Sequence, residues 1–476
     1  MLSSRSSSAR IFGAMPPTSN GAAGPSPARG LLARLGLSRP ELRAWAMYDW
    51  ATSAMQTVIM TAVFPIYFVS VAGANLPPER ATQQLSLVNS IALALVAVAS
   101  PILGAISDLA ANKKRMLAGF MIAGVTATGG MYWIQHGDLA LASVLFIVSM
   151  IGATGSFVFY ESLLPHIARG DEIDRVSTAG FALGYFGGGL LLALNLAWIQ
   201  KPELFGLPAG EGLAPSQATL PARLAFVSVG VWWALFSIPL FRRVPEPPRA
   251  REPDEPRAGR AIAGAFSRLG ETLRELRGFR HAFIFLMAFL IYNDGIQTII
   301  KMATAYGTEI GIDSGALIAA ILIVQFVGVP FAFLFGMFAG KIGAKRAIFV
   351  GLLAYTAISV LGYFMTTATH FFVLAGLVGM VQGGTQALSR SLFASMVPKH
   401  KSGEFFGFFS VFEKFAGIVG PLFFYVAIEL TGSSRSAILS IIAFFAVGAA
   451  LLWKVDPAEG ARAARAAEAD LLVTTT

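Results

Sequence analysis

Residues 139–163 read LALASVLFIVSMIGATGSFVFYESL, and this stretch decides the fold class. Glu161 is its one charged residue, and large apolar side chains dominate the remainder. A helix needs about 20 such residues to cross the ~30 Å hydrocarbon layer of a membrane. Backbone groups find no water to bond inside lipid, so a segment of this composition is helical there. The stretch therefore predicts a transmembrane α-helix.

The same pattern recurs along the chain. Of its 476 residues, 55% are hydrophobic and 13% are charged, whereas a soluble domain carries about 25% charged residues. A soluble core of this length has no room for so many apolar side chains. We expect an all-α polytopic membrane protein with twelve transmembrane helices, at residues 45–70, 85–107, 115–135, 139–163, 178–200, 222–242, 281–305, 314–339, 346–366, 371–397, 405–430 and 435–454.

The positions of lysine and arginine predict the orientation. Of these 36 residues, 29 fall in the termini and in the loops on the same side, and the opposite loops hold Arg80, Lys201, Arg223 and Arg435. Cytoplasmic loops carry the excess of basic residues in membrane proteins. Both termini are therefore expected in the cytoplasm, and the net charge of +9 needs no nucleic-acid partner. The alanine- and arginine-rich composition favours the cytoplasmic (inner) membrane of a bacterium.

The apolar runs form two sets of six. The long loop after the sixth run begins with a Pro-, Arg- and Glu-rich stretch, which is typical of a linker, and continues as an amphipathic segment. The first residues have no apolar run and are predicted to be disordered. The expected organisation is a disordered tail (1–28), an interfacial amphipathic segment (29–43), an N-terminal six-helix bundle (44–242), a cytoplasmic linker with an amphipathic helix (243–280), a C-terminal six-helix bundle (281–454) and a cytoplasmic tail (455–476).

The two sets repeat each other in places. Gly104-x-x-x-Asp108 at the end of the second run aligns with Gly336-x-x-x-Gly340 at the end of the eighth. The first run contains QTVI from Gln56, and the seventh contains QTII from Gln297. Pseudo-repeats of this kind are typical of secondary transporters.

A charged loop follows the second run. Gly104 and Asp108 precede the basic residues Lys113, Lys114 and Arg115. The positive-inside rule alone explains the basic residues but not the carboxylate. The pattern resembles the loop signature of major facilitator transporters, and this resemblance implies a gating charge network at the cytoplasmic face.

Further stretches resemble one branch of that superfamily. They are WAMYDWATSA (45–54), LPHI (164–167), RVS (175–177), GYFGGG (184–189), YNDG (292–295) and QGGTQALSRS (382–391). These stretches are similar to the family once called "unknown major facilitators", which includes the fungal vacuolar amino-acid effluxer of autophagy. The likeness spans about residues 44–454 and departs from the family at Glu161, where a small amide or a similar residue is expected. It implies the major facilitator fold, in which the first helix of each three-helix unit lines a central cavity.

Polar residues inside the apolar runs predict where a solute binds. An ionisable residue in a membrane costs roughly 2.5–3.5 kcal/mol, so it should face protein or water. On the first, seventh and tenth runs, polar residues, charged and uncharged, recur at helical spacing and form one polar stripe on each helix. Stripes of this kind also serve as interhelical contacts, and that alternative stays open. The predicted substrate-binding or coupling residues are Asp49, Gln56, Glu161, Asp294, Gln297, Lys301, Gln382, Gln386 and Arg390.

Individual positions allow finer expectations. Asp294 lies midway along its run, and with Lys301 and Arg390 it offers both signs of charge to a zwitterion. Asp49 lies near one end of its run, so a gating or capping role is an alternative. Glu413 and Lys414 are adjacent and point about 100° apart, so one of them is expected to pair with Arg390 or with another helix instead of facing the cavity.

These patterns favour one function class. We expect a monomeric secondary active transporter for an amino acid or a peptide-like solute, working by alternating access with protons as a candidate coupling ion. Export of amphipathic compounds or lipids and a non-transporting sensor role remain alternatives. The chain has no cysteine, no paired histidines and no nucleotide-binding Gly-x-x-x-x-Gly-Lys-Ser/Thr motif. We therefore expect no enzymatic activity, no metal and no cofactor.

Overall fold

The computed structural model describes residues 31–76, 81, 84–85, 87–89, 91–96, 112–169, 172–210, 212–247, 265–310, 312, 314–416, 423, 426–427, 430 and 434–475. Regular structure in these ranges is helical throughout. The elements are α1 (Leu31–Arg34), α2 (Pro40–Ala54), η1 (Met55–Ala62), α3 (Val63–Tyr67), η2 (Phe68–Ala72), α5 (Lys113–Gly130), η3 (Met131–Trp133), α6 (Leu139–Ile167), α7 (Ile173–Gln200), η4 (Pro202–Phe205), α8 (Pro215–Ala218), α9 (Leu220–Arg243), α11 (Ala265–Gly278), α12 (Arg280–Glu309), α13 (Ser314–Ile342), α14 (Ala344–Tyr363), α15 (Ala368–Ser395), η5 (Lys399–Lys401), α16 (Ser402–Phe415), α18 (Ser434–Ser440), α19 (Ile442–Trp453) and α20 (Pro457–Thr475).

The predicted all-α membrane fold is confirmed. Within the described ranges, nine helices are long and apolar enough to cross a membrane, and each coincides with a predicted run. The predicted run 115–135 corresponds to α5, which begins with three basic residues. The predicted runs 85–107 and 405–430 lie partly outside the described residues.

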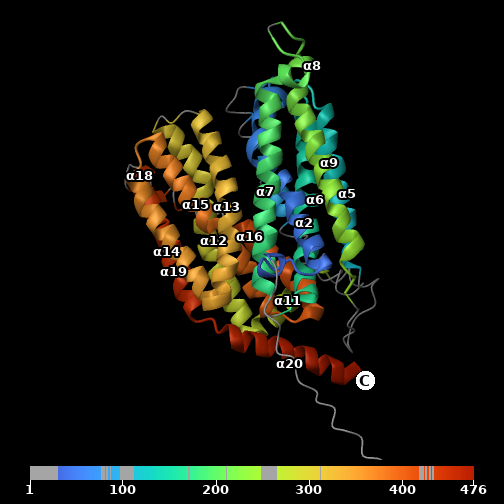
Figure 1. Cartoon of the computed structure of the whole chain (residues 1–476), viewed down its shortest axis with the longest axis vertical. Coiled ribbons are helices and arrows are strands. Elements are labelled where there is room, and N and C mark those ends of the chain that lie inside the picture. The colour runs from blue at the N-terminus through green and yellow to red at the C-terminus, as the bar shows by residue number, and fades with distance from the viewer. Residues whose placement is uncertain are drawn as a thin grey trace, which may run out of the picture.

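The transmembrane helices form two groups that stand side by side (Figure 1). One group contains α2, α5, α6, α7 and α9, and the other contains α12, α13, α14, α15, α16, α18 and α19. Helix α7 of the first group packs along α13 and α15 of the second, and α6 packs on α16. Large side chains such as Leu353 (71% exposed) and Val144 (58% exposed) point outward, as expected for a surface in contact with lipid.

The first transmembrane helix is continuous from Pro40 to Ala72 but changes its winding. In η1 and η2 the turns are wider than in an α-helix: the backbone N–H of Val63 donates to the carbonyl of Val58, five residues earlier. Wide turns of this type occur often at functional sites in helices. They rotate the side chains of η1 relative to those of α2.

Close approach of α7 to the first helix depends on glycine. A Cβ atom on Gly187 would lie 2.7 Å from the carbonyl oxygen of Trp50, which is closer than real contacts allow. Small residues let membrane helices approach in this way, because no side chain separates the two backbones.

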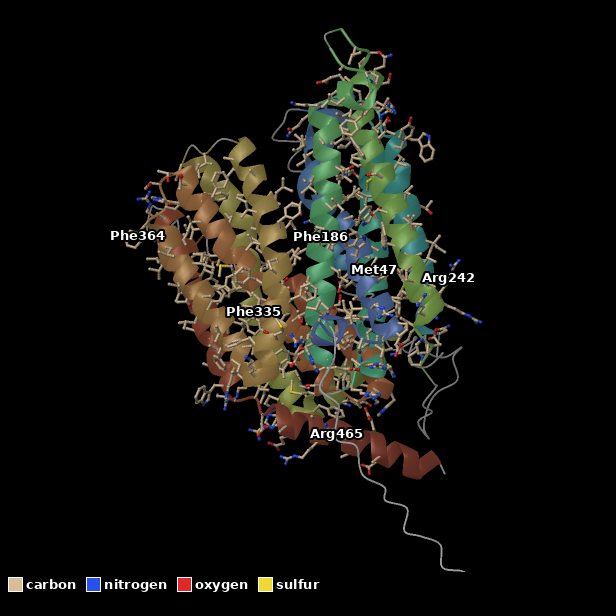
Figure 2. The ribbon with its side chains drawn as sticks, in the orientation of Figure 1. Met47, Phe186, Arg242, Phe335, Phe364 and Arg465 are labelled. Atoms are coloured by element: carbon tan, nitrogen blue, oxygen red, sulfur yellow. The ribbon has the colours of Figure 1, made fainter. Side chains whose placement is uncertain are left out.

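One end of the molecule carries the basic residues Arg39, Lys113, Lys114, Lys345, Lys399 and Lys401, and we call it the basic end. Helix α11 lies there and buries Thr272 and Leu276, one turn apart, against its neighbours. Helix α20 crosses the same end and contacts α12 and α15 (Figure 1). Figure 2 shows Arg465 of α20 at this end, and Phe364 lies toward the other end.

Candidate functional site

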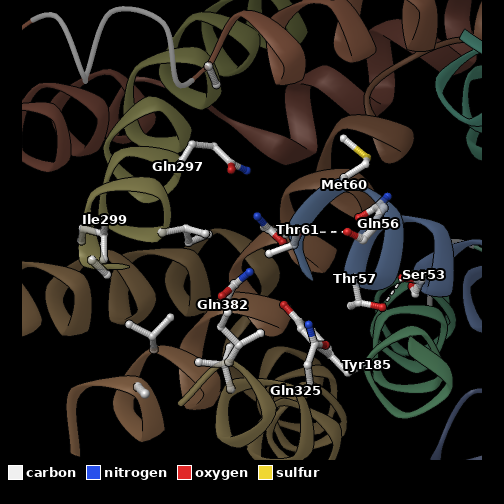
Figure 3. Close-up of a pocket in the computed structure, with 18 of the residues that line it drawn as sticks. Ser53, Gln56, Thr57, Met60, Thr61, Tyr185, Gln297, Ile299, Gln325 and Gln382 are labelled. Carbon is white, nitrogen blue, oxygen red and sulfur yellow. Dashed lines mark hydrogen bonds between the residues drawn. The ribbon is translucent and has the colours of Figure 1, made fainter. Parts of the chain in front are cut away.

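A cavity of about 790 Å³ lies between the two helix groups. Its wall includes residues of α2, η1, α6 and α7 from one group and of α12, α13, α14 and α15 from the other. Figure 3 shows polar side chains of both groups facing one another across this space, among them Gln56, Gln297, Gln325 and Gln382.

The lining changes character along the cavity. Asp49 and Glu161 lie at the end nearer the basic end, because α2 begins there and α6 finishes there. Glutamines form the middle of the wall. Apolar residues such as Phe371 and Leu374, from the first turns of α15, line the opposite part. A solute in the cavity therefore meets carboxylates, then amides, then an apolar surface.

The wide turns of η1 supply part of the polar wall. Gln56, Thr57, Met60 and Thr61 all line the cavity. The hydroxyl of Thr57 donates to the carbonyl of Ser53 at 3.0 Å and approaches the carbonyl of Gly188 at 3.2 Å. The first helix is thus tied to α7 where its winding changes.

A buried cluster of charges lies at the basic-end limit of the cavity. The Oδ2 atom of Asp49 accepts hydrogen bonds from the hydroxyl of Tyr160 at 2.7 Å and from Nη2 of Arg390 at 3.2 Å. Nη1 of Arg390 lies 4.0 Å from Oε1 of Glu161. Nε and Nη2 of Arg390 donate to the hydroxyl and the carbonyl of Ser177, each at 2.9 Å. We call these five residues the Arg390 cluster.

Aromatic rings surround the guanidinium group of Arg390. Its central carbon lies 4.4 Å from the ring centre of Phe181, 4.9 Å from that of Trp45 and 5.8 Å from that of Tyr160. The side chain of Arg390 is 1% exposed. Attraction between a cation and aromatic faces helps to compensate for its removal from water. Because Arg390 belongs to α15 and its partners belong to α2, α6 and α7, the cluster joins the two helix groups.

Further contacts between the groups lie closer to the basic end. The hydroxyl of Ser391 donates to Oδ1 of Asp174 at 2.5 Å. The hydroxyl of Ser402 donates to the carbonyl of Ser162 at 3.1 Å, and Nζ of Lys113 donates to Ser402 at 2.9 Å. The two helix groups are therefore joined on the basic side of the cavity.

The structure brings most of the predicted site residues together. Those that line the cavity are Asp49, Gln56, Glu161, Gln297, Gln382 and Gln386. Asp294 and Arg390 are buried but do not line it. Lys301 lies on α12, and its side chain is outside the described residues. The predicted stripes are thus divided, because only part of each stripe faces the cavity.

The predicted gating loop is covered in part. Gly104 and Asp108 lie outside the described residues. Lys113 is buried at the basic end, Lys114 donates from Nζ to the carbonyls of Phe241 and Val244 at 3.0 and 2.6 Å, and Arg115 is exposed.

Several residues of the site were not among those predicted from the sequence. Gln325 lines the cavity, and its amide in an otherwise apolar run was an available signal. Glu413 also lines the cavity, although it was not among the residues predicted to face it. Tyr160 and Ser177 carry no distinguishing signal, because hydroxyl groups are common contacts between membrane helices. Within the described part of the chain, no group of three His, Asp or Glu side chains is arranged to bind a metal.

Comparison with known proteins agrees with this architecture. A model of the family described as "Vacuole effluxer Atg22 like" matches residues 79–465. The "Uncharacterized MFS-type transporter YxiO" of Bacillus subtilis (strain 168) is 37% identical over 410 residues, which cover 86% of this chain and 93% of that protein. Autophagy-related protein 22 of Yarrowia lipolytica is 26% identical over 322 residues, which cover 62% of this chain and 52% of that protein. The chain thus spans about half the length of this fungal relative.

Solved structures share the fold at lower identity. The proton:xylose symporter XylE matches with a TM-score of 0.63 at 16% identity, over 87% of this chain and 95% of that one. The human organic anion transporter MFSD10 (TETRAN) matches with a TM-score of 0.62 at 14% identity, over 89% of this chain and all of that one (100%). The two-group helical architecture, the matching family model and the likeness to YxiO establish that this chain is an integral membrane protein of the Atg22-like effluxer family within the major facilitator superfamily of transporters.

Proposed function

We propose that this protein is a secondary active transporter that moves an amino acid or a peptide-like solute by alternating access. The observation that carries this proposal is the cavity between the two helix groups, with the Arg390 cluster joining the groups on its basic side. Its volume of about 790 Å³ falls within the range of roughly 300–1,000 Å³ that is typical of small-molecule sites. Separation of the cluster would connect the same cavity with the basic end.

The amide side chains support a small polar cargo. Five glutamines line the cavity: Gln56, Gln297, Gln325, Gln382 and Gln386. Each amide both donates and accepts hydrogen bonds, so a ring of them suits a solute that carries a carboxylate and an ammonium group. The carboxylates of Asp49 and Glu161 add negative charge at one end of this ring.

Orientation and energy source form part of the same proposal. We place the basic end and both termini in the cytoplasm, in agreement with the excess of lysine and arginine there. The membrane is the cytoplasmic membrane of a bacterium, and the working unit is one chain. Protons are the coupling ion, because ionisable side chains at membrane depth commonly form proton relays in transporters.

The test is counterflow of a panel of labelled amino acids and dipeptides in proteoliposomes, with and without an imposed pH gradient. We expect exchange of at least one compound, a response to the gradient, and a loss of at least tenfold in Gln382→Ala. Leu353→Ala is the matched control, since Leu353 faces outward and its loss leaves the cavity intact. Absence of exchange for the whole panel would remove this proposal.

A second candidate cargo is an amphipathic compound. Phe371, Leu374 and Val378 give part of the cavity an apolar wall, which a purely polar solute would not need. This candidate would be favoured if the proteoliposomes exchanged an amphipathic dye but none of the amino acids of the panel.

A further inference from the structure

The two carboxylate oxygens of Asp49 have different surroundings. Oδ2 accepts hydrogen bonds from Tyr160 and Arg390 inside the buried cluster. The same residue lines the cavity. Among the described residues, none donates a hydrogen bond to Oδ1. An ionised carboxylate has about four acceptor positions, so Asp49 retains the capacity to bind a donor that arrives from the cavity.

A cation that enters the cavity meets carboxylate and amide side chains in its described lining. Its ionisable acidic residues are Asp49, Glu161 and Glu413, and the described lining side chains include no lysine, arginine or histidine. The guanidinium group of Arg390 is 1% exposed and is directed at Asp49, Glu161 and Ser177. A solute ammonium group that reaches Asp49 therefore finds Oδ2 already bonded to Tyr160 and Arg390, whereas Oδ1 accepts no hydrogen bond from the described residues.

We propose that Asp49 binds the ammonium group of the cargo at Oδ1 and that this binding loosens its contact with Arg390, so that loading of the cavity releases the basic end. This inference rests on the proposed function and assigns one part of it, the recognition of the cargo's cation. The ammonium group of the cargo and the guanidinium group of Arg390 are both attracted by the single negative charge of Asp49. The ammonium group thus weakens the attraction between Asp49 and Arg390 by competing for it.

The consequence is a coupling between loading and opening. In the empty protein, separation of the helix groups would leave the buried carboxylate of Asp49 without a cation, which is unfavourable. In the loaded protein, the cargo supplies that cation. A ligand shifts a conformational equilibrium only by binding one state better than the other, and the ammonium group at Asp49 provides that difference.

Competition with blocked amino acids tests the recognition step. For a transported amino acid, the methyl ester keeps the ammonium group and lacks the carboxylate, and the N-acetyl derivative has the reverse pattern. We expect the ester to inhibit counterflow within about tenfold of the parent, and the N-acetyl derivative to be at least 100-fold weaker. Inhibition by the N-acetyl derivative at the strength of the parent would overturn the assignment while leaving transport, and therefore the proposed function, in place.

Thiol labelling tests the release step. The chain has no cysteine, so Ser391→Cys introduces a unique thiol at the contact between α15 and α7. We expect cargo or its methyl ester to raise the rate of labelling of this thiol several-fold, and the N-acetyl derivative to leave the rate unchanged. Glu271→Cys on the exposed face of α11 is the labelling control, with a rate that does not depend on cargo. In the Asp49→Asn background the Ser391→Cys thiol should react at one rate with and without cargo. A cargo-induced increase that persists in Asp49→Asn would overturn the inference.

Discussion

Arg390 of α15 contacts residues of three other helices at once, so its side chain restricts how those helices can be placed. Its guanidinium group is fully buried, contacts Asp49 and Ser177, and lies under three aromatic rings. Removal of one partner of a buried ion pair costs about 3–5 kcal/mol, because the other charge stays buried without compensation. Loss of either partner alone is therefore expected to destabilise the fold, in addition to its effect on gating.

Arg390→Gln should lower both stability and transport. We expect a clear drop in the midpoint of thermal unfolding in detergent and a loss of counterflow. The double variant Asp49→Asn/Arg390→Gln should recover part of the stability, because it removes both charges of the pair and leaves Glu161 as the remaining charge of the cluster, but should not recover transport. Arg277→Gln is the matched control on the exposed face of α11. Wild-type counterflow in Arg390→Gln would contradict a gating role for this residue.

Gly180 controls the space beside the Arg390 cluster. A Cβ atom at this position would overlap Oδ2 of Asp49 and lie 3.1 Å from Nη2 of Arg390. Gly180→Ala should therefore displace the Asp49–Arg390 contact and reduce counterflow at least tenfold. Gly119→Ala is the matched control, because a Cβ there meets no atom within 4 Å. Equal counterflow in the two variants would show that the contact tolerates displacement.

The sequence identifies the charged residues of the site but not their arrangement. Asp49, Glu161 and Arg390 are conspicuous in apolar runs because charge is costly in lipid. Their pairing depends on how helices far apart in sequence are rotated, and local spacing does not determine that rotation. Gln325 shows the same limit, since an amide in a membrane helix serves equally well as a contact between helices.

The first turn of α20 carries a group of hydrogen bonds that attach this helix to α12. Oδ1 of Asp456 accepts the backbone N–H groups of Ala458 and Glu459 at 2.9 and 3.0 Å. The backbone N–H of Asp456 donates to Nδ1 of His281 at 3.0 Å, and Nε2 of His281 lies 2.8 Å from Oε2 of Glu459. These contacts hold the start of α20 on α12.

The backbone N–H groups of Glu459 and Ala458 hold the pKa of Asp456 below its usual value of 3.8. A carboxyl group with a lowered pKa stabilises the folded form fully above that usual value, and the stabilisation disappears as pH falls through the lowered pKa. The protection factor of the amides in the first turn of α20, which is hydrogen exchange corrected for its intrinsic dependence on pH, should therefore be high at neutral pH and fall at strongly acid pH. Asp456→Ala should show low protection factors at every pH, whereas Arg465→Ala, on the exposed face, should match the wild type. A wild-type profile in Asp456→Ala would contradict the capping role.

Element boundaries show which part of a helix the sequence predicts well. The run predicted at 45–70 corresponds to a helix from Pro40 to Ala72, and the run at 178–200 corresponds to α7, which begins at Ile173. The length of an apolar run matches the thickness of the hydrocarbon layer. The helix itself continues beyond this layer, until its terminal backbone groups find other hydrogen-bond partners. The wide turns of η1 were not predicted, because they preserve apolar composition and change only the winding.

Alternating access requires the two helix groups of the molecule to separate at the basic end. The contacts there cross from one group to the other, as between Ser162 of α6 and Ser402 of α16. Contacts inside a group, such as that between the hydroxyls of Thr128 and Ser149 at 2.5 Å, should persist through the transport cycle. The membrane fold follows from composition alone, but this difference between the two kinds of contact becomes visible only in three dimensions.

The most direct measurement is counterflow in proteoliposomes before and after a cross-link is formed at the basic end. The absence of native cysteine allows Ser162→Cys/Ser402→Cys to be linked selectively with a short bifunctional thiol reagent that a reductant cleaves. Thr128→Cys/Ser149→Cys, inside one group, is the matched control. Alternating access predicts that linking the two thiols of Ser162→Cys/Ser402→Cys abolishes counterflow and that the reductant restores it. The control variant should transport at an unchanged rate when its two thiols are linked. Undiminished counterflow with the basic end cross-linked would contradict alternating access through this site.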